Sequence, residues 1–304
     1  MKVSLTGATG FIGSHVLAEL QQHGHEVTAL VRDDSQAEAV AAAAVTPAVV
    51  DLYDRPAVVR LLSDADGAIH TASPGDETSA DLDSAVVDAA IEVFDGTGKP
   101  YLHITGAWVY GGNTHITEDS PIDAPAMVSW KEPIARRALD ASDMRGVVIA
   151  PGVAYGDGGG GVPGLLLGSP RDDAGNLIML GTGQQHWATV HVADLADFFR
   201  RALEDDSARG HYVVGDGLNP TVADLTEAAA AATGAPGAVP GSDDEARARL
   251  GDYFAEVLLL DQSADSARAR DELDWHPSNP GLVDDFHHGS YRNVAEHGSE
   301  SNAT

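Results

Sequence analysis

The chain has 304 residues, no cysteine and a formal net charge of −29 at pH 7. Without cysteine it has no disulfide, no thiolate catalyst and no cysteine metal site, and its negative field disfavours nucleic acid and anionic membranes as partners. No apolar run is long enough to span a bilayer, and a strand that begins at Val3 leaves no room for a signal peptide, so we expect a cytoplasmic protein.

The charge also bears on habitat. Lys2, Lys99 and Lys131 are the only lysines, and acidic residues are spread along the whole chain. A surface rich in carboxylates and poor in lysine is typical of salt adaptation, so we predict a halophilic acidic protein. A generally acidic surface encoded by a GC-rich genome is the alternative.

The N-terminus predicts a strand, a glycine-rich turn and a helix. The apolar strand Val3–Leu5 runs into residues 6–13, which read TGATGFIG, and a helical pattern follows. Gly7 permits a tight turn, Gly10 allows a pyrophosphate to approach the backbone, and Gly13 lets the helix pack on the strand. The spacing is G-x-x-G-x-x-G rather than the commonest G-x-G-x-x-G. The strand before it and the helix after it nevertheless favour a dinucleotide site at the helix N-terminus.

Strand-like and helix-like segments alternate through the first half of the chain. The predicted strands are Val3–Leu5, Glu26–Val31, Ala48–Val50, Gly67–His70, Tyr101–Thr105 and Val147–Ala150. The predicted helices are Phe11–Gln22, Gln36–Ala44, Arg55–Leu62, Ser84–Phe94 and Trp130–Ala141. This alternation predicts an α/β fold with a doubly wound parallel sheet.

The pattern changes beyond residue 150. We expect a mobile glycine-rich loop at Gly156–Gly161, a helix over Asp194–Leu203 capped by Asp194, and a strand at Val257–Leu260. The polar tail Asn293–Thr304 is expected to be frayed. A smaller C-terminal α/β lobe is therefore predicted beside the parallel sheet.

Further motifs follow the glycine turn in a characteristic order. They are Gly24–Arg32, His70–Ala72, Val109–Gly111, Thr117–Pro121, Pro151–Gly156, Val190–Ala196 and Leu273–Pro277. In this order, over roughly residues 2–290, the chain resembles the extended short-chain dehydrogenase/reductases, the NAD-dependent epimerase/dehydratase family.

The resemblance implies a Rossmann domain at residues 1–152, to which residues 189–205 return, and a mainly substrate-binding lobe at 153–304. It implies a small-molecule substrate and a homodimer joined through Ser84–Phe94 and Trp130–Ala141. The predicted cofactor-binding residues are Gly7, Thr9, Gly10, Phe11, Ile12, Gly13, Arg32, Asp51, Leu52, Thr71, Ala72, Pro151, Gly152 and Val153.

The end of the second strand bears on cofactor choice. An NAD site places a carboxylate there, whereas this chain has Val31 followed by Arg32, which can pair with a 2′-phosphate. We therefore predict NADP. Asp33 and Asp34 lie close enough to reach a ribose hydroxyl, which leaves NAD open.

The usual catalytic pair of the family, a tyrosine with a lysine four residues on, is missing. One alignment puts Val128 and Glu132 at the tyrosine and lysine positions, and a shift by one residue puts Met127 and Lys131 there instead. In either alignment the phenol that would exchange a proton with substrate is absent.

The remaining catalytic candidates are Thr105 and His186. Thr105 lies one residue before the usual catalytic serine position, which holds Gly106. His186 lies where nucleotide-sugar epimerases carry an arginine, and Ala150 replaces a second frequent arginine, so a nucleotide-sugar substrate is disfavoured. No metal site is predicted, since His287-His288 lacks the spacing of a helical metal pair.

Two functions fit these residues. The favoured one is an NAD(P)-dependent oxidoreductase or epimerase-like enzyme that acts on a small carbonyl, alcohol or sugar-like compound. The alternative is a non-catalytic NADP(H)-binding protein that senses redox state and signals to a partner.

Overall fold

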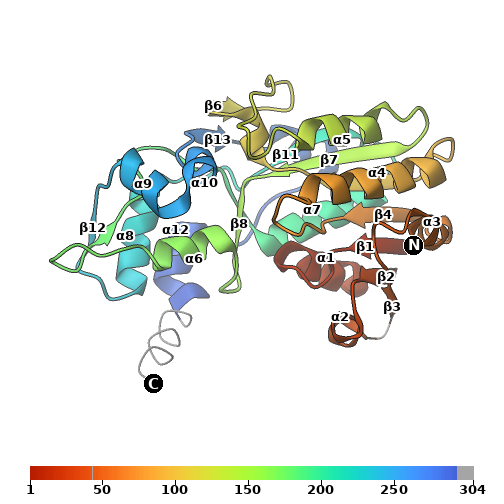
Figure 1. Ribbon diagram of the computed structural model, residues 1–304, viewed down its shortest axis with the longest axis horizontal. Coiled ribbons are helices and arrows are strands. Elements are labelled where there is room, and N and C mark those ends of the chain that lie inside the picture. Colours follow the sequence, from red (N-terminus) through yellow and green to blue (C-terminus); the bar gives the residue numbers. More distant parts are fainter. Residues whose placement is uncertain (43, 293–304) are drawn as a thin grey trace.

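A computed structural model of the protein describes residues 1–42 and 44–292, and its centre is one seven-stranded parallel sheet (Figure 1). The strand order is β11-β7-β5-β4-β1-β2-β3. The strands are β1 (Lys2–Thr6), β2 (Glu26–Val31), β3 (Val45–Val49), β4 (Gly67–His70), β5 (Pro100–Ile104), β7 (Arg145–Pro151) and β11 (Gly210–Val214). The order reverses between β1 and β4, and such a reversal opens a crevice at the carboxyl ends of the strands. The predicted doubly wound sheet is confirmed.

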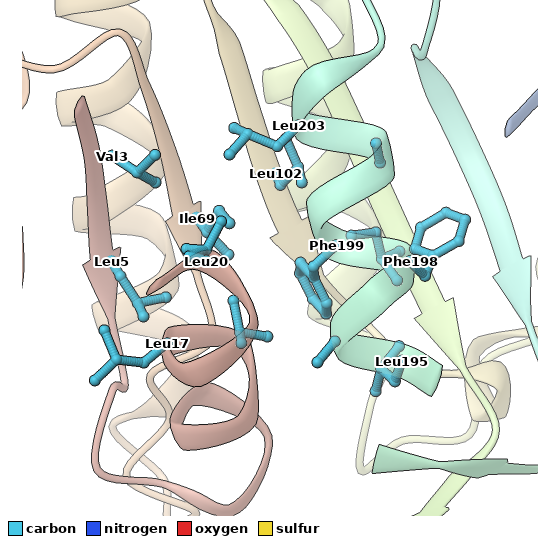
Figure 2. Close-up of a cluster of buried hydrophobic side chains, with 14 of the residues drawn as sticks. Val3, Leu5, Leu17, Leu20, Ile69, Leu102, Leu195, Phe198, Phe199 and Leu203 are labelled. Carbon is cyan, nitrogen blue, oxygen red and sulfur yellow. The ribbon is translucent and has the colours of Figure 1, made fainter. Parts of the chain in front are cut away.

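Helices cover both faces of the sheet, each over its own apolar cluster. On one face lie α1 (Phe11–Gln22), α2 (Asp34–Val40), α7 (Val192–Glu204) and α11 (Ala267–Leu273). On the other lie α3 (Arg55–Ser63), α4 (Ser79–Phe94) and α5 (Lys131–Asp140). Figure 2 shows the first cluster, in which Leu17 and Leu20 of α1 and Phe199 of α7 face the buried side chains of the strands.

A smaller C-terminal part has its own apolar core. Its helices are α6 (Gly161–Leu167), α8 (Val222–Ala232), α9 (Asp243–Leu250), α10 (Asp252–Leu258) and α12 (Leu282–His288). Three short parallel pairs complete the chain: β8 (Val153–Tyr155) with β10 (Thr189–His191), β9 (Leu177–Ile178) with β12 (Ala238–Val239), and β6 (Asn113–Ile116) with β13 (Gln262–Ala264). A 3₁₀ turn, η1 (Ala107–Tyr110), precedes β6. None of the helices within the described ranges is long and apolar enough to cross a membrane.

Two local predictions differ from the structure. Val257–Leu260 is not a strand, because Val257 and Leu258 are the buried end of α10, and four apolar residues fit a helix as well as a strand. The predicted glycine-rich loop is present over residues 156–160, and α6 begins at Gly161. The helix predicted over Gln36–Ala44 ends at Val40. The tail at 293–304 lies outside the described residues.

Asp194 is not the N-cap of α7. That position belongs to His191, whose side chain accepts a hydrogen bond from the Ala193 amide at 3.2 Å. The Asp194 carboxylate is instead buried and accepts from the amides of Ser278 at 3.0 Å and Asn279 at 3.1 Å. It therefore ties the segment after α11 to α7.

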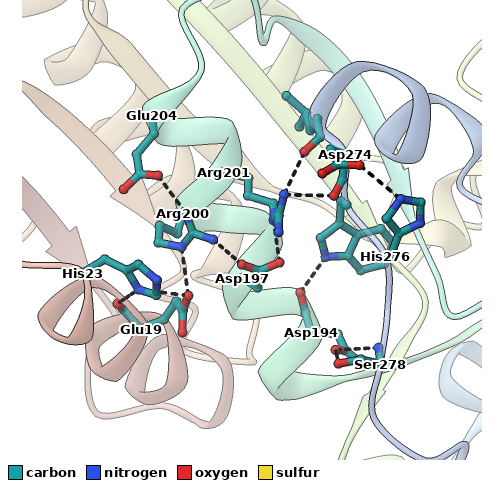
Figure 3. A network of polar contacts seen from close by, with 12 residues as sticks. Glu19, His23, Asp194, Asp197, Arg200, Arg201, Glu204, Asp274, His276 and Ser278 are labelled. Atoms are coloured by element: carbon teal, nitrogen blue, oxygen red, sulfur yellow. Dashed lines mark hydrogen bonds and ion pairs between the residues drawn. The ribbon is translucent and has the colours of Figure 1, made fainter.

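A polar network extends along the same helix (Figure 3). The Trp275 indole donates to the backbone oxygen of Asp194 at 2.9 Å, and Arg201 donates to the backbone oxygen of Asp274 at 2.9 Å. Arg200 pairs with Glu19 of α1 at 2.9 Å. These contacts hold α1, α7 and residues 274–279 together on one face of the sheet.

We expect the substitution Asp194→Ala to lower the free energy of unfolding by about 3 kcal/mol, because two amides lose a charged acceptor in a buried site. Urea unfolding monitored by circular dichroism would measure this. The matched control is Asp271→Ala, an exposed position on α11, which should change stability by less than about 0.5 kcal/mol. Equal losses in the two variants would contradict the assigned role.

Candidate active site

Three connected cavities follow the carboxyl edge of the sheet. The glycine-turn cavity measures about 890 Å³, the central cavity about 250 Å³ and the outer cavity about 600 Å³. Ser73 lines both the glycine-turn and outer cavities, and Thr105, Gly106 and Trp108 line both the outer and central ones. The three therefore adjoin one another through shared wall residues, at the position expected for a ligand in this sheet topology.

The glycine turn is closed too tightly for side chains. Gly7 has φ +79°, and a Cβ on it would lie 2.6 Å from the Ala72 nitrogen. A Cβ on Gly13 would lie 2.0 Å from the Gly7 oxygen. Gly10 is the N-cap of α1, and no side chain caps it there. The first amides of α1 consequently face the cavity without a side-chain acceptor, which suits an anionic group such as a diphosphate.

The far end of the glycine-turn cavity holds the residues after β2 and β3. Arg32 is exposed and lines the cavity beside Gln36, whose side chain accepts a hydrogen bond from the Arg32 amide at 3.1 Å. Asp33 is occupied as the N-cap of α2, where it accepts from the Gln36 amide at 2.9 Å. Two charged residues line this end of the cavity: Arg32, which is positive, and Asp51, which is negative.

The predicted cofactor residues separate between two of the cavities. Those that line the glycine-turn cavity are Gly7, Thr9, Gly10, Arg32, Asp51, Leu52, Thr71 and Ala72. Those that line the central cavity are Phe11, Ile12, Pro151, Gly152 and Val153. Gly13 lies beneath the turn rather than on either wall, where its missing Cβ permits the contact with Gly7.

The outer cavity contains Lys131 rather than Glu132. Lys131 lines its wall, and its Nζ lies 4.3 Å from the centroid of the Trp130 ring. Glu132 instead accepts from Arg136 at 2.6 Å, one turn along α5. Lys131 therefore lies on the cavity wall and Glu132 does not, and both Met127 and Val128, from the turn before α5, line the same cavity.

The two catalytic candidates lie in different surroundings. Thr105 lines the outer and central cavities and donates a hydrogen bond to the Ile149 oxygen at 3.2 Å. His186 lines none of the three cavities, and its Nδ1 lies 2.9 Å from the Asp261 carboxylate. Thr105 and Lys131 are brought to one cavity, and His186 is not brought with them.

A buried polar cluster lies behind Lys131. The carboxylate of Asp83 on α4 is 3.1 Å from His70 Nε2, 3.5 Å from His103 Nε2 and 4.0 Å from Lys131 Nζ. Asp83 and both histidines are almost fully buried. Neither Asp83 nor His103 belongs to a recognisable motif, because each lies in a segment whose sequence is that of an ordinary helix or strand.

Burial and charge act against each other in this cluster. Burial would raise the pKa of Asp83, but the hydrogen bond with His70 and the charges nearby bring that pKa below its usual value. Burial lowers the pKa of Lys131, and Asp83 partly offsets this. Burial, with the charge of His70, lowers the pKa of His103 to about 3. His103 is therefore neutral at physiological pH.

Comparison with known proteins identifies the family of the chain. The model of the NAD dependent epimerase/dehydratase family matches residues 3–215. The chain belongs to this family. It is 30% identical over 297 residues to the Saccharomyces cerevisiae protein YLL056C, covering 94% of this chain and 98% of that protein. It is 29% identical over 308 residues to a 3-diazoavenalumate denitrifying reductase of Streptomyces, covering 93% and 98%.

The fold is also similar to solved structures. The human epimerase family protein SDR39U1 (isoform 2), solved with NADPH, superposes with a TM-score of 0.71 at 23% identity, covering 97% of this chain and 99% of that one. The predicted extended short-chain dehydrogenase/reductase family is confirmed, and the description of the matching family model, NAD dependent, supports a nicotinamide dinucleotide as the class of cofactor.

The low pKa of His103 makes stability depend on pH. Between pH 6.5 and about pH 3, the unfolded chain binds a proton on this imidazole and the folded chain does not. The free energy of unfolding should therefore fall as pH falls through this window, by up to about 1.4 kcal/mol per pH unit from this group. Urea unfolding at several pH values would measure the slope. It should become shallower in His103→Asn and stay unchanged in His115→Asn, an exposed control.

Proposed function

We propose that the chain is an NADP(H)-dependent oxidoreductase that interconverts a small carbonyl compound and its alcohol. The observation that carries this proposal is the meeting of Lys131 and Thr105 in the outer cavity, which continues into the glycine-turn cavity. A proton donor thus faces the same cleft that suits a dinucleotide. The bound nicotinamide would supply or accept the hydride.

Different residues of the chain would bind the different parts of the cofactor. The amides at the start of α1, freed by Gly10 from any side-chain cap, would hold the diphosphate. Arg32 would hold a 2′-phosphate, which favours NADP over NAD. Asp33 does not compete, because its carboxylate caps α2. Pro151–Val153 and Phe11 would enclose the nicotinamide end in the central cavity.

Lys131 would take the part that a phenol usually plays in this family. Met127 stands at the tyrosine position and has no proton to give, whereas the Lys131 ammonium lies on the same wall. Its pKa is lowered by burial, which makes it a better acid than an exposed lysine. Thr105 would orient the substrate oxygen if its hydroxyl proton turned to that oxygen from the Ile149 carbonyl, to which it donates in this structure.

The lining of the outer cavity favours a substrate with an apolar body. The large apolar and aromatic side chains on its wall are those of Trp108, Met127, Val128, Trp130 and Tyr253. The related Streptomyces protein is a reductase, which supports reduction as the direction. A nucleotide sugar is disfavoured, since the expected diphosphate-gripping arginines are replaced by His186 and Ala150.

We also propose a domain division, an oligomeric state and a compartment for the protein. Residues 1–152, with 189–205, would form the cofactor domain, and most of 153–304 the substrate lobe, to which Tyr253 on α10 belongs. Two chains would pair through α4 and α5 as a homodimer. We place the protein in the cytoplasm of a salt-adapted cell, in keeping with its net charge of −29.

The choice of NADP rests on Arg32 and is tested by its removal. Arg32→Ala should raise the Kd for NADPH by about 10- to 100-fold, because a charge-assisted contact to the 2′-phosphate is lost. The Kd for NADH should change less than about threefold. Calorimetry in multimolar KCl would measure both. Arg60→Ala, which removes an exposed arginine from α3, is the matched control and should leave both values unchanged.

The enzyme function is tested with NADPH and a panel of apolar aldehydes and ketones. Lys131→Met should lower kcat by about 100-fold or more while the Kd for NADPH stays the same, because proton donation is lost and cofactor binding is not. Lys99→Met, at a lysine bound to the Ala65 oxygen, is the control and should keep full activity.

If the unmodified chain binds NADPH but turns over no member of this panel, the enzyme proposal is wrong. The absence of a phenol at Met127 and Val128 then favours the redox-sensing alternative. A pull-down that recovers a different set of proteins with NADPH than without it would support that function.

A further inference from the structure

The carboxylate of Asp83 is an unusual group to find beneath a parallel sheet. It is 2% exposed and faces the sheet from the first half of α4. Its Oδ1 accepts from His70 Nε2 at 3.1 Å, and its Oδ2 lies 4.0 Å from the Lys131 ammonium and 3.5 Å from His103 Nε2. A buried carboxylate needs a partner that carries positive charge. His70 at 3.1 Å and Lys131 at 4.0 Å both lie within ion-pair distance, and of the two Lys131 is the one that lines the outer cavity.

We propose that Asp83 is a positioning residue, which holds the Lys131 ammonium protonated and directed into the outer cavity. This inference rests on the proposed function for the meaning of Lys131, but the ion pair can be tested without any turnover. Neither Asp83 nor the two histidines line the outer cavity, so they act through Lys131 and not on the substrate.

The surroundings of Asp83 fix its orientation from three elements. A carboxylate can only accept hydrogen bonds, so His70 donates to it through Nε2, and Thr6 Oγ1 lies 2.6 Å from the other ring nitrogen of His70. His103 on β5 is held on its far side by the Tyr101 hydroxyl at 3.3 Å. His70 is thus held through both ring nitrogens and orients the carboxylate, whereas His103 Nε2 lies 3.5 Å from Asp83 without a hydrogen bond.

Other charges near the pair are already engaged or lie in solvent. Arg137, one and a half turns after Lys131 on α5, donates to Asp88 and Ser84 of α4. Asp76 and Glu77 lie at the wall of the outer cavity, and Asp76 accepts from Thr78. Loss of the Asp83 charge would therefore leave Lys131 half-buried without a close counter-ion.

The same three residues resemble a metal site, since ligand atoms of His70, Asp83 and His103 lie within 4.8 Å of one another. A divalent cation there would share the Asp83 carboxylate with the Lys131 ammonium, which lies 4.0 Å from Oδ2. Two neighbouring cations on one buried carboxylate repel strongly at low dielectric. The lysine therefore favours the ion pair over a metal.

The proposed step is a simple proton transfer. An N–H bond of the Lys131 ammonium breaks as an O–H bond forms on the substrate oxygen, and the amine is then reprotonated from water in the outer cavity. Asp83 remains ionised throughout. It raises the pKa of Lys131 against the effect of burial, so that the side chain is charged again before the next cycle.

The three-lysine composition makes a direct experiment feasible. A chain labelled with ¹³Cε-lysine has one resonance each from Lys2, Lys99 and Lys131, and Lys131→Arg assigns the last. We expect Asp83→Asn to lower the pKa of Lys131 by about one unit or more, because a neighbouring negative charge is removed. The matched control is Asp88→Asn, which removes a second carboxylate from α4. Asp88 pairs with Arg137 and not with Lys131, so this change should leave the pKa of Lys131 unchanged.

An unchanged Lys131 titration in Asp83→Asn would overturn the proposal, whether or not the protein turns over a substrate. If that variant does not fold, the wild-type spectrum remains decisive: ionisation of Asp83 must appear as a second, acidic inflection of the Lys131 resonance that Lys99 lacks. Titration with Zn²⁺ completes the test. Displacement of the Lys131 resonance by stoichiometric Zn²⁺ would contradict the ion pair and assign the cluster to a metal.

Discussion

The close approach of Gly13 to Gly7 is the constraint on which the cleft depends. A Cβ at Gly13 would lie 2.0 Å from the Gly7 oxygen, so α1 can start directly above β1 only because that atom is missing. This placement brings the first amides of α1 to the reversal point of the sheet, where the crevice opens. It also brings the apolar face of α1 against α7. Arg200 of α7 pairs with Glu19 of α1, and Asp194 of α7 accepts from the Ser278 amide of the C-terminal segment.

The architecture was largely predictable, since the alternation of buried strands and amphipathic helices specifies a doubly wound sheet on its own. The glycine turn was predictable for the same reason: its residues have a local role. Errors arose where local sequence is ambiguous. Val257 and Leu258 are apolar in either a strand or a helix, and only their burial against the smaller core decides between them. Aspartate is a favourable N-cap residue, but the Asp194 carboxylate accepts hydrogen bonds from the amides of Ser278 and Asn279, which are distant in the sequence.

The catalytic side of the cleft was less predictable, because its residues come from distant segments. A one-residue alignment shift separates Lys131 from Glu132, and only the direction of the side chains on α5 distinguishes them. Asp83 and Tyr253 carry no motif at all. The chain keeps the glycine-rich turn, while Met127 and Val128, neither of which carries a phenol, line the outer cavity beside Lys131, whose ammonium lies 4.0 Å from the buried Asp83 carboxylate.

The packing of α1 against α7 carries a consequence for synthesis of the chain. Every strand pair that the described residues form is parallel, so no hairpin can assemble early, and α7 leaves the ribosome long after α1. Until then the apolar face of α1 has no covering helix. Assembly of such non-local contacts is slow, and nascent chains of this kind are exposed to aggregation. We therefore expect the folding of this chain to depend on chaperones and not to be completed rapidly during translation.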